Sequence, residues 1–409
     1  MISTIGYCTN VHAGTDLDTI RDNLQRYAVD VHRNLTGDAP LGVGLWLPQK
    51  AASQLAASDE EMREFRAFLD QRHLEAFTIN GFPYDNFHQD IVKHQVYEPA
   101  WWDPRRLVYT KQLAHVMTSL LPESQKVGSI STLPIGWPTD SIHLGLAKSK
   151  ELDLAGTQLR DLADFLAALE ARSGRRIVVA IEPEPGCILD SATDLIQWFE
   201  KQLPNSVHRR YIQVCHDICH SAVMMEPQQE VLSRYAAAGI GIGKVQVSSA
   251  VVADWDSMAI HRRQEAIEQL AQFAEDRYLH QTGRMAADGS FTLVEDLPQL
   301  LSQTPTSGDP AQASGDPAQG DMRWVVHFHV PIFLERFGRL STSQSEILKC
   351  LKALHDDAAL ATPTIDFTGH FEIETYAWTV LPEAMRKRGL ADDVATEIRW
   401  LNKEWIDSM

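Results

Sequence analysis

Short apolar segments alternate with longer amphipathic segments along the first 250 residues of the chain. The short segments are rich in β-branched and aromatic residues, which is typical of buried strands. The longer segments carry apolar residues at helical spacing, as in the stretch 16–35. The pattern predicts strands at 2–12, 41–48, 74–81, 126–137, 175–186, 211–220 and 242–250. Such regular alternation predicts an α/β protein with a parallel sheet.

Two further apolar segments, 322–333 and 369–378, bring the number of strand candidates to nine. We expect a (β/α)₈ TIM barrel, which has eight strand positions, so one candidate must lie outside it. The segment 324–330 is the first choice, because it follows an irregular stretch. A doubly wound sheet is the alternative, but no G-x-G-x-x-G motif follows the first strand, which disfavours its dinucleotide-binding form.

The irregular stretch predicts an insertion near 280–322 within a single TIM-barrel domain that spans 1–409. A hairpin is expected at 284–297, and the low-complexity segment 304–321, in which SGDPAQ occurs twice, is expected to be a flexible linker. A second irregular segment, the loop 82–104, is rich in aromatic residues. Loops of that length in a compact domain are usually functional or disordered, and the aromatic content favours function.

Composition and charge limit the classes of function that this protein can have. The chain has 409 residues, of which 44% are hydrophobic and 22% charged, as in soluble globular proteins. A net charge of −18 disfavours nucleic-acid binding and binding to anionic membranes. The five dispersed cysteines do not form a disulfide pattern, and neither a signal peptide nor a long apolar run is present. We therefore expect a cytoplasmic protein without membrane insertion.

Polar residues gather where predicted strands end, which is where active sites form in parallel α/β folds. In the segment 211–220, Asp217 and His220 stand three residues apart, and this oxygen and imidazole pair suits Mn²⁺, Fe²⁺, Co²⁺ or Zn²⁺. Similar residues end other strands: Glu182, Glu184, Gln246, His327, His329, Glu374 and Tyr376. Buried charges are costly unless they are paired or bind a metal, so these positions indicate a site.

Structural interpretations stand beside the functional ones. Glu182 could cap a helix or pair with an arginine, and Asp217 alone could be a turn residue. His327 and His329 are each open to a ligand role or a core role. Other residues are expected to be structural or to form internal pairs: Cys215, His216 and Cys219 as packing residues, Glu372 paired with Lys244, and Trp101, Trp102 and Trp137 either in a pocket wall or in packing.

The order E…D-x-x-H…Q…H-x-H…E resembles the xylose isomerase-like TIM-barrel superfamily, which includes sugar isomerases, sugar epimerases and endonuclease IV-type enzymes. The strings GYCTNVHAG, IEPEPG, HDICH, KVQVSS, HFHVPIF and EIETYAW further resemble the metabolite traffic protein EboE group. The resemblance spans nearly the whole chain apart from 304–321.

The resemblance to the sugar epimerases implies one divalent metal ion (Mn, Co, Fe or Zn) held by Glu182, Asp217, Gln246 and Glu374, with His220 facing the substrate. Gln246 stands where these epimerases have a histidine, which weakens this ligand, and His329 could replace it. The additional imidazole ligands of the endonuclease IV-type enzymes have no clear match, which disfavours DNA repair.

The leading functional expectation is a metal-dependent isomerase or epimerase of a polyol or sugar-like metabolite, in an EboE-type metabolite traffic pathway. Glu182 and Glu374 would move protons and His220 would orient a hydroxyl. Substrate contacts are expected from His12, Trp137, Glu184, His327 and Tyr376. The alternatives are a non-catalytic metabolite-binding protein with a degraded metal site and a metal-dependent phosphoester hydrolase. A homodimer is left open.

Overall fold

The computed structural model describes residues 4–35, 37, 39–138, 148–302, 316, 318–386 and 388–407. Eight strands form a closed barrel in the order β1-β14-β7-β6-β5-β4-β3-β2, and each neighbouring pair is parallel. The strands are β1 (Thr4–Cys8), β2 (Leu41–Trp46), β3 (Leu74–Asn80), β4 (Val127–Thr132), β5 (Arg176–Ile181), β6 (Ile212–Asp217), β7 (Ile242–Val247) and β14 (His370–Ile373). The predicted TIM barrel is confirmed, and the doubly wound alternative is wrong because the sheet closes on itself.

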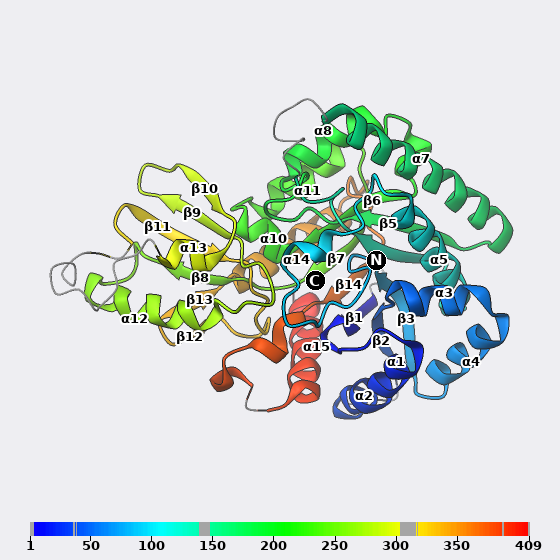
Figure 1. The fold of residues 1–409 in the computed structure, drawn as a ribbon, viewed down its shortest axis with the longest axis horizontal. Helices are drawn as coiled ribbons and strands as arrows, with labels where there is room; N and C mark the ends of the chain where they lie inside the picture. Colours follow the sequence, from blue (N-terminus) through cyan, green and yellow to red (C-terminus); the bar gives the residue numbers. More distant parts are fainter. Residues whose placement is uncertain are drawn as a thin grey trace.

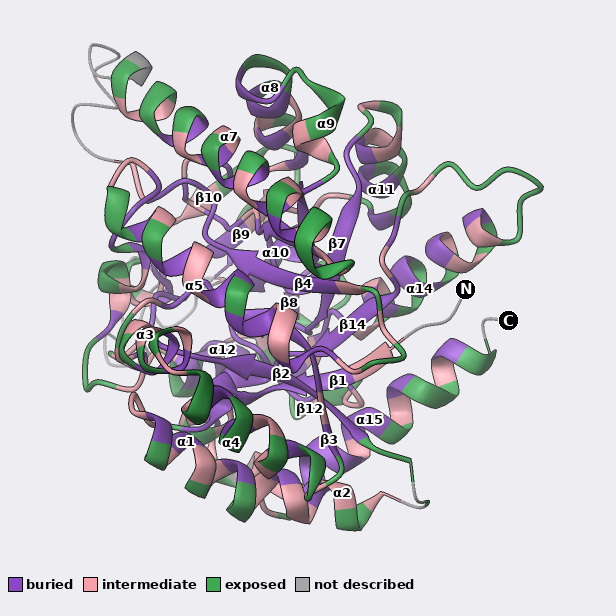
Figure 2. Ribbon diagram, turned by 90° about the vertical axis from the view of Figure 1, so that its right-hand side faces the viewer, coloured by how far each residue is buried: buried purple, intermediate pink, exposed green. Residues whose placement is uncertain are grey.

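Helices surround the barrel, with buried strands at its centre and exposed residues on the outer helix faces (Figure 2). Some of these helices begin at a capping residue of the local sequence. Ser58 and Ser191 accept hydrogen bonds from backbone N–H groups in the first turns of α4 and α8. The helices of the barrel part are α1 (Leu17–Asn23), α2 (Val29–Asn34), α3 (Gln49–Ala57), α4 (Asp59–Asp70), α5 (Pro104–Leu120), α7 (Lys148–Ser173), α8 (Ala192–Gln202), α9 (Ser206–Arg209), α10 (Ile218–Val223), α11 (Gln228–Ala237), α14 (Gln344–Ala358) and α15 (Leu390–Asp407).

A second, antiparallel sheet lies beside the barrel, at the left of Figure 1. Its order is β10-β9-β11-β8-β13-β12, and we call residues 251–342 the antiparallel region. The strands are β8 (Val251–Asp254), β9 (Thr282–Ala286), β10 (Phe291–Val294), β11 (Asp321–Val326), β12 (Arg336–Phe337) and β13 (Leu340–Thr342), accompanied by α12 (Ile260–Leu270) and α13 (Leu297–Ser302). The segment 324–330 therefore starts in β11 and lies outside the barrel, as expected.

The second sheet extends beyond the predicted insertion 280–322. The expected hairpin forms from β9 and β10, but β8, β12 and β13 come from residues on either side of that range. β8 was not predicted, because the expected strand 242–250 ends just before it and only antiparallel pairing with β11 and β13 defines it. Most of the predicted linker 304–321 lies outside the described residues.

The antiparallel region has its own apolar core, which the loop 82–104 joins. Phe87 and Val92 of that loop pack with Trp255, Trp324 and Phe328. The loop is therefore held between the barrel and the second sheet, directly above the ends of the barrel strands. Among the described residues, no helix has the length and apolar character needed to cross a bilayer.

Candidate active site

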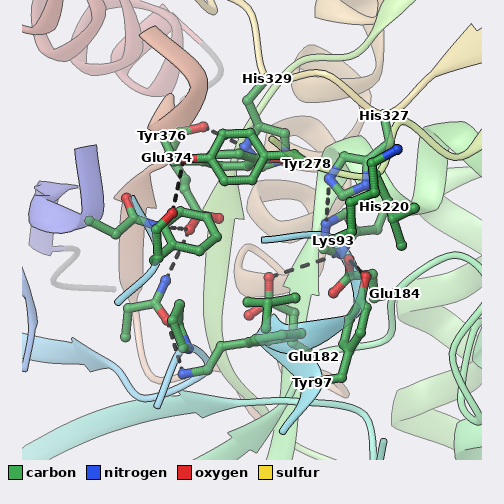
Figure 3. A pocket seen from close by; sticks show the side chains of 17 residues that line it. Lys93, Tyr97, Glu182, Glu184, His220, Tyr278, His327, His329, Glu374 and Tyr376 are labelled. Carbon is green, nitrogen blue, oxygen red and sulfur yellow. Dashed lines mark hydrogen bonds and ion pairs between the residues drawn. The ribbon is translucent and has the colours of Figure 1, made fainter. Parts of the chain in front are cut away.

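A pocket opens at the carboxyl ends of the barrel strands, between the barrel, the loop 82–104 and the antiparallel region (Figure 3). Its empty volume is about 530 Å³, a figure that includes the open space at its mouth. It is lined by Asn10, Asn80, Phe82, Pro83, Phe87, Lys93, Val96, Tyr97, Glu182, Glu184, His220, Tyr278, Leu279, His327, His329, Glu374 and Tyr376. The parallel barrel brings strand ends that are far apart in the chain to one face.

Three buried carboxylates converge at the base of this pocket. Glu182, Asp217 and Glu374 each offer an oxygen, and these oxygens lie within 4.8 Å of one another. Burial raises the pKa of Glu182 well above its ordinary value, and the neighbouring Glu374 carboxylate raises it further. Burial also raises the pKa of Glu374, as does the charge of Asp217. Carboxylates this close oppose one another's ionisation, so a cation bound among them would stabilise the ionised cluster.

Asp217 is held with one oxygen directed at this cluster. Its Oδ1 accepts hydrogen bonds from the backbone N–H of His220 at 2.9 Å and from the Ser248 hydroxyl at 2.8 Å. Its Oδ2 is buried without a hydrogen-bond partner among the described residues. Burial opposes ionisation of Asp217, but the imidazoles of His220 and His329 hold its pKa below the ordinary value. Asp217 is therefore an ionised carboxylate with one oxygen available to a ligand.

His329 presents a bare ring nitrogen to the same point. Its Nδ1 lies 2.8 Å from the carbonyl oxygen of Glu374, and because a carbonyl only accepts, Nδ1 must carry the proton. Its Nε2 is buried, has no partner among the described residues, and lies 4.0 Å from Oδ2 of Asp217. Burial lowers the pKa of His329 to about 4, so the ring is neutral near pH 7.

Glu374 is oriented by two amides that the sequence analysis missed. Asn10 and Asn80 donate to the same oxygen, Oε1, at 2.7 and 2.9 Å. The Asn80 amide is fixed in turn, because its Oδ1 accepts from the backbone N–H of Phe82 at 3.1 Å. Asn80 is the last residue of β3, so its position at a strand end was a usable signal.

A second group of ligand-type atoms lies next to the first. Glu184, His220 and His327 offer atoms within 4.8 Å of one another. His220 donates from Nδ1 to the carbonyl oxygen of Pro183 at 2.8 Å, so its Nε2 is bare in the neutral ring. This Nε2 lies 3.2 Å from Nε2 of His327.

Gln281, from the antiparallel region, sets the tautomer of His327. Its amide nitrogen Nε2 lies 3.1 Å from the carbonyl oxygen of Pro185, so its Oε1 faces His327 and accepts from Nδ1 at 2.8 Å. Nε2 of His327 is then bare as well. The lone pairs of these two nitrogens face each other and repel. A hydroxyl hydrogen or a cation bound in the space shared by the two rings and Glu184 would relieve this repulsion. The sequence contained no signal for Gln281, because its partners are remote in the chain.

The structure gives the remaining candidates different positions. Glu184, His327 and Tyr376 line the pocket, whereas His12 and Trp137 are not among the lining residues. His12 is bonded to the Tyr7 hydroxyl at 3.1 Å and stacked on Tyr27, and Trp137 stacks on Tyr97. Both side chains therefore pack against neighbouring rings, and their predicted substrate contacts stay a prediction.

Gln246 lies inside the barrel, fully buried, in register with Asp217 and Glu372. Neither of its amide atoms has a partner among the described residues, and it does not line the pocket. The expected Lys244–Glu372 ion pair is confirmed deeper in the barrel. The expectation for His216 is also confirmed, since it bonds Gln228 at 2.7 Å on the far side of the strand.

The residues present fit a divalent metal ion. Glu182, Asp217 and Glu374 supply hard oxygen ligands and His329 supplies a neutral imidazole, the donor set that suits Mn²⁺, Fe²⁺, Co²⁺ or Zn²⁺. Orphaned buried atoms on Glu182, Asp217 and His329 are the observation behind this fit, because buried polar atoms otherwise find partners.

Comparison with known proteins agrees with the fold. No protein-family model matches the chain and no curated protein is significantly similar to it. A xylose isomerase-like TIM-barrel protein from Mycobacterium smegmatis, solved in complex with magnesium, aligns over 99% of this chain and 97% of its own with a TM-score of 0.50 and 11% identity. The chain has a xylose isomerase-like TIM-barrel fold. Identity this low shows the fold alone.

Other solved structures align at lower scores. The IolI protein with a bound zinc atom covers 100% of this chain and 98% of its own, with a TM-score of 0.44 and 10% identity. The probable 3-DHS dehydratase AsbF from Bacillus anthracis covers 98% of this chain and 99% of its own, with a TM-score of 0.43 and 12% identity. None of these comparisons confirms the resemblance to the EboE group.

Proposed function

We propose that the protein is a metal-dependent isomerase or epimerase of a polyol or sugar-like metabolite. The observation that carries this proposal is the convergence of Glu182, Asp217 and Glu374 within 4.8 Å, buried at the base of a pocket for small molecules. Such a cluster has little structural value, since buried like charges destabilise a fold. A divalent cation and a substrate with several oxygens together supply what the cluster lacks.

Glu182, Asp217, Glu374 and His329 would hold the ion. When bound, it supplies Lewis-acid stabilisation of negative charge on substrate oxygens.

The chain's own groups can carry the protons. In the proposed reaction, one of Glu182 and Glu374 takes the proton from the carbon next to the substrate carbonyl, and the electron pair moves onto the carbonyl oxygen as an enediolate. The other carboxyl group returns a proton to the opposite face of the same carbon in an epimerase, or to the neighbouring carbon in an isomerase. In the isomerase, the hydroxyl proton also moves to the former carbonyl oxygen. Burial raises the pKa of both carboxyl groups, which favours the protonated form that returns a proton.

Other residues would orient the substrate and exclude water. The bare Nε2 of His220 can accept a hydrogen bond from a substrate hydroxyl, as can that of His327. Phe87, Tyr278 and Tyr376 pack together above the polar groups, with ring centroids 4.9 to 5.3 Å apart, and Tyr376 meets the other two rings edge to face. This aromatic roof shields the reacting atoms from bulk solvent, which strengthens their electrostatic interactions.

The test replaces the two glutamates separately. Glu182→Gln and Glu374→Gln proteins, loaded with Mn²⁺, are assayed against free aldoses, ketoses and polyols by NMR. A loss of turnover of at least about a hundredfold in each, with metal still bound, is the expected result. The matched control is Glu200→Gln, an exposed carboxylate on α8. Full activity of both variants would contradict the proposal.

A second candidate is a metabolite-binding protein without turnover, as the resemblance to the EboE group implies. Gln246 in place of a histidine favours it, because an amide is a weak metal ligand. Elemental analysis of the purified protein distinguishes the two: substoichiometric metal together with tight metabolite binding supports the carrier. Hydrolysis of phosphoesters in the same screen would support the third hypothesis.

A further inference from the structure

We propose that the substrate is uncharged and that Asp296 selects against phosphorylated ligands by neutralising Lys93. This inference rests on the proposed function and narrows the substrate class of the same site. Lys93 comes from the loop 82–104 and Asp296 from the antiparallel region, so the selection arises where these two segments meet over the barrel.

The charge of the pocket is the first argument. Glu182, Glu184 and Glu374 line it, and Asp217 lies in the same cluster. A divalent ion bound to the cluster would bring two positive charges against these four carboxyl groups. Among the described residues that line the pocket, Lys93 is the one lysine or arginine. Sites for phosphate usually present arginine or lysine donors that are free to pair with it.

The ammonium group of Lys93 is already paired. Its Nζ lies 2.7 Å from Oδ2 of Asp296, whose side chain is only 6% exposed. Asp296 is held in place because its Oδ1 accepts from the backbone N–H of His280 at 3.2 Å. The backbone of the lysine is held as well, since the N–H groups of Val92 and Lys93 donate to the carbonyl oxygen of Arg277 at 2.8 and 3.0 Å.

The ammonium group of Lys93 is therefore already paired within the protein and is not free to bind a ligand. A phosphate group would have to displace Asp296 from Lys93 while approaching the carboxylate of Glu184. A hydroxyl has no such penalty, and Glu184, His220 and His327 offer acceptors for it. The competing explanation is that the ion pair only fastens the loop to the second sheet, in which case ligand charge would not matter.

The experiment uses Mn²⁺-loaded full-length protein and calorimetric binding. The probes are inorganic phosphate and matched pairs of a free sugar with its phosphate monoesters, beginning with D-fructose and D-glucose. In the wild type, inorganic phosphate and the monoesters are expected to bind more weakly than the free sugars. Asp296→Asn keeps an acceptor for His280 but removes the charge, and should tighten binding of phosphate and of the monoesters at least about tenfold.

Three further variants test whether the freed ammonium group of Lys93 causes the tighter binding of phosphate. Asp296→Asn combined with Lys93→Met should lose the gained affinity, because the freed ammonium is then absent. Glu295→Gln makes the same change of charge one residue away, where the carboxylate pairs with His94 at 3.2 Å, and should leave phosphate binding unchanged. Asp296→Ser, with a residue favoured before the first turn of a helix, replaces the asparagine variant if that variant does not fold.

The outcomes separate this inference from the proposed function. A phosphate monoester that binds the wild type more tightly than its free sugar overturns the inference, as does a folded, metal-loaded Asp296→Asn protein with unchanged phosphate affinity. Failure of the protein to bind Mn²⁺ overturns the proposed function, whereas the inorganic phosphate measurement still decides the role of Asp296.

Discussion

Nε2 of His329 lies 4.0 Å from Oδ2 of Asp217, and both atoms are buried without a hydrogen-bond partner among the described residues. One atom comes from the antiparallel region and the other from the end of β6. The carbonyl oxygen of Glu374 fixes the His329 tautomer in which Nε2 is bare. The two atoms are therefore placed so that both could bind the same metal ion.

We predict that His329→Ala will weaken metal binding at least about tenfold, because it removes a neutral imidazole whose unpartnered Nε2 faces Oδ2 of Asp217. Gln246→Met should bind metal with nearly wild-type affinity, because an amide oxygen is a weaker ligand than a carboxylate or an imidazole. Metal titration by competition with a chromogenic chelator measures both. Weak binding by the Gln246 variant together with normal binding by the His329 variant would assign the fourth ligand to Gln246.

Asn80→Ala is expected to lower turnover about tenfold with a smaller effect on substrate affinity. The amide holds Oε1 of Glu374 at 2.9 Å, and a hydrogen bond to a carboxylate contributes about 1.5–3 kcal/mol. Asn10→Ala should act in the same direction, since its amide donates to the same oxygen at 2.7 Å. The control is Asn34→Ala, whose amide bonds Asp392 at the surface. Steady-state kinetics that show wild-type turnover would refute this positioning role.

Lys244→Met is predicted to destabilise the fold by about 3–5 kcal/mol, because it leaves the carboxylate of Glu372 buried and uncompensated. Both side chains of this ion pair are fully buried inside the barrel. Replacing both residues together, Lys244→Met with Glu372→Leu, should recover much of the loss. Urea unfolding of the four proteins, in the same metal state, measures the coupling, and strictly additive losses would argue against a coupled pair.

Stability should depend on pH through Glu397. Burial raises the pKa of Glu397 to about 7, although Oε1 accepts from the Thr375 hydroxyl at 2.7 Å and from the backbone N–H of Ile332 at 3.1 Å. The unfolded chain has a pKa of about 4.3, so the folded state binds the proton more tightly and its advantage disappears as pH rises from about 4.3 to about 7.

Glu397→Gln should therefore match the wild type near pH 4 and be more stable at pH 8, by up to about 3 kcal/mol. Urea unfolding across this range, with Glu200→Gln as an exposed control, measures the difference. A stability difference that does not change with pH would show that Glu397 is not protonated in the folded protein.

The amino-acid sequence by itself was enough to identify the eight barrel strands and several of the polar residues that end them. Strand and helix periodicities are local, so they can be read without knowing what a segment contacts. The same local logic located Glu182, Asp217, His220 and Glu374, because a parallel barrel brings all strand ends to one face. It also placed Glu372 beside Lys244, one strand away.

Only the tertiary structure decided which residues complete the pocket. β8, β11 and β13 form a second sheet through pairings that no local pattern encodes, and this sheet delivers His327, His329 and Gln281 to the barrel. Asn80 reaches Glu374 across nearly three hundred residues, and Lys93 reaches Asp296 across two hundred. His12 and Trp137 lie beyond the observed ends of β1 and β4, packed against Tyr27 and Tyr97. Periodicity determines which way a side chain faces, whereas its partner depends on how distant segments pack.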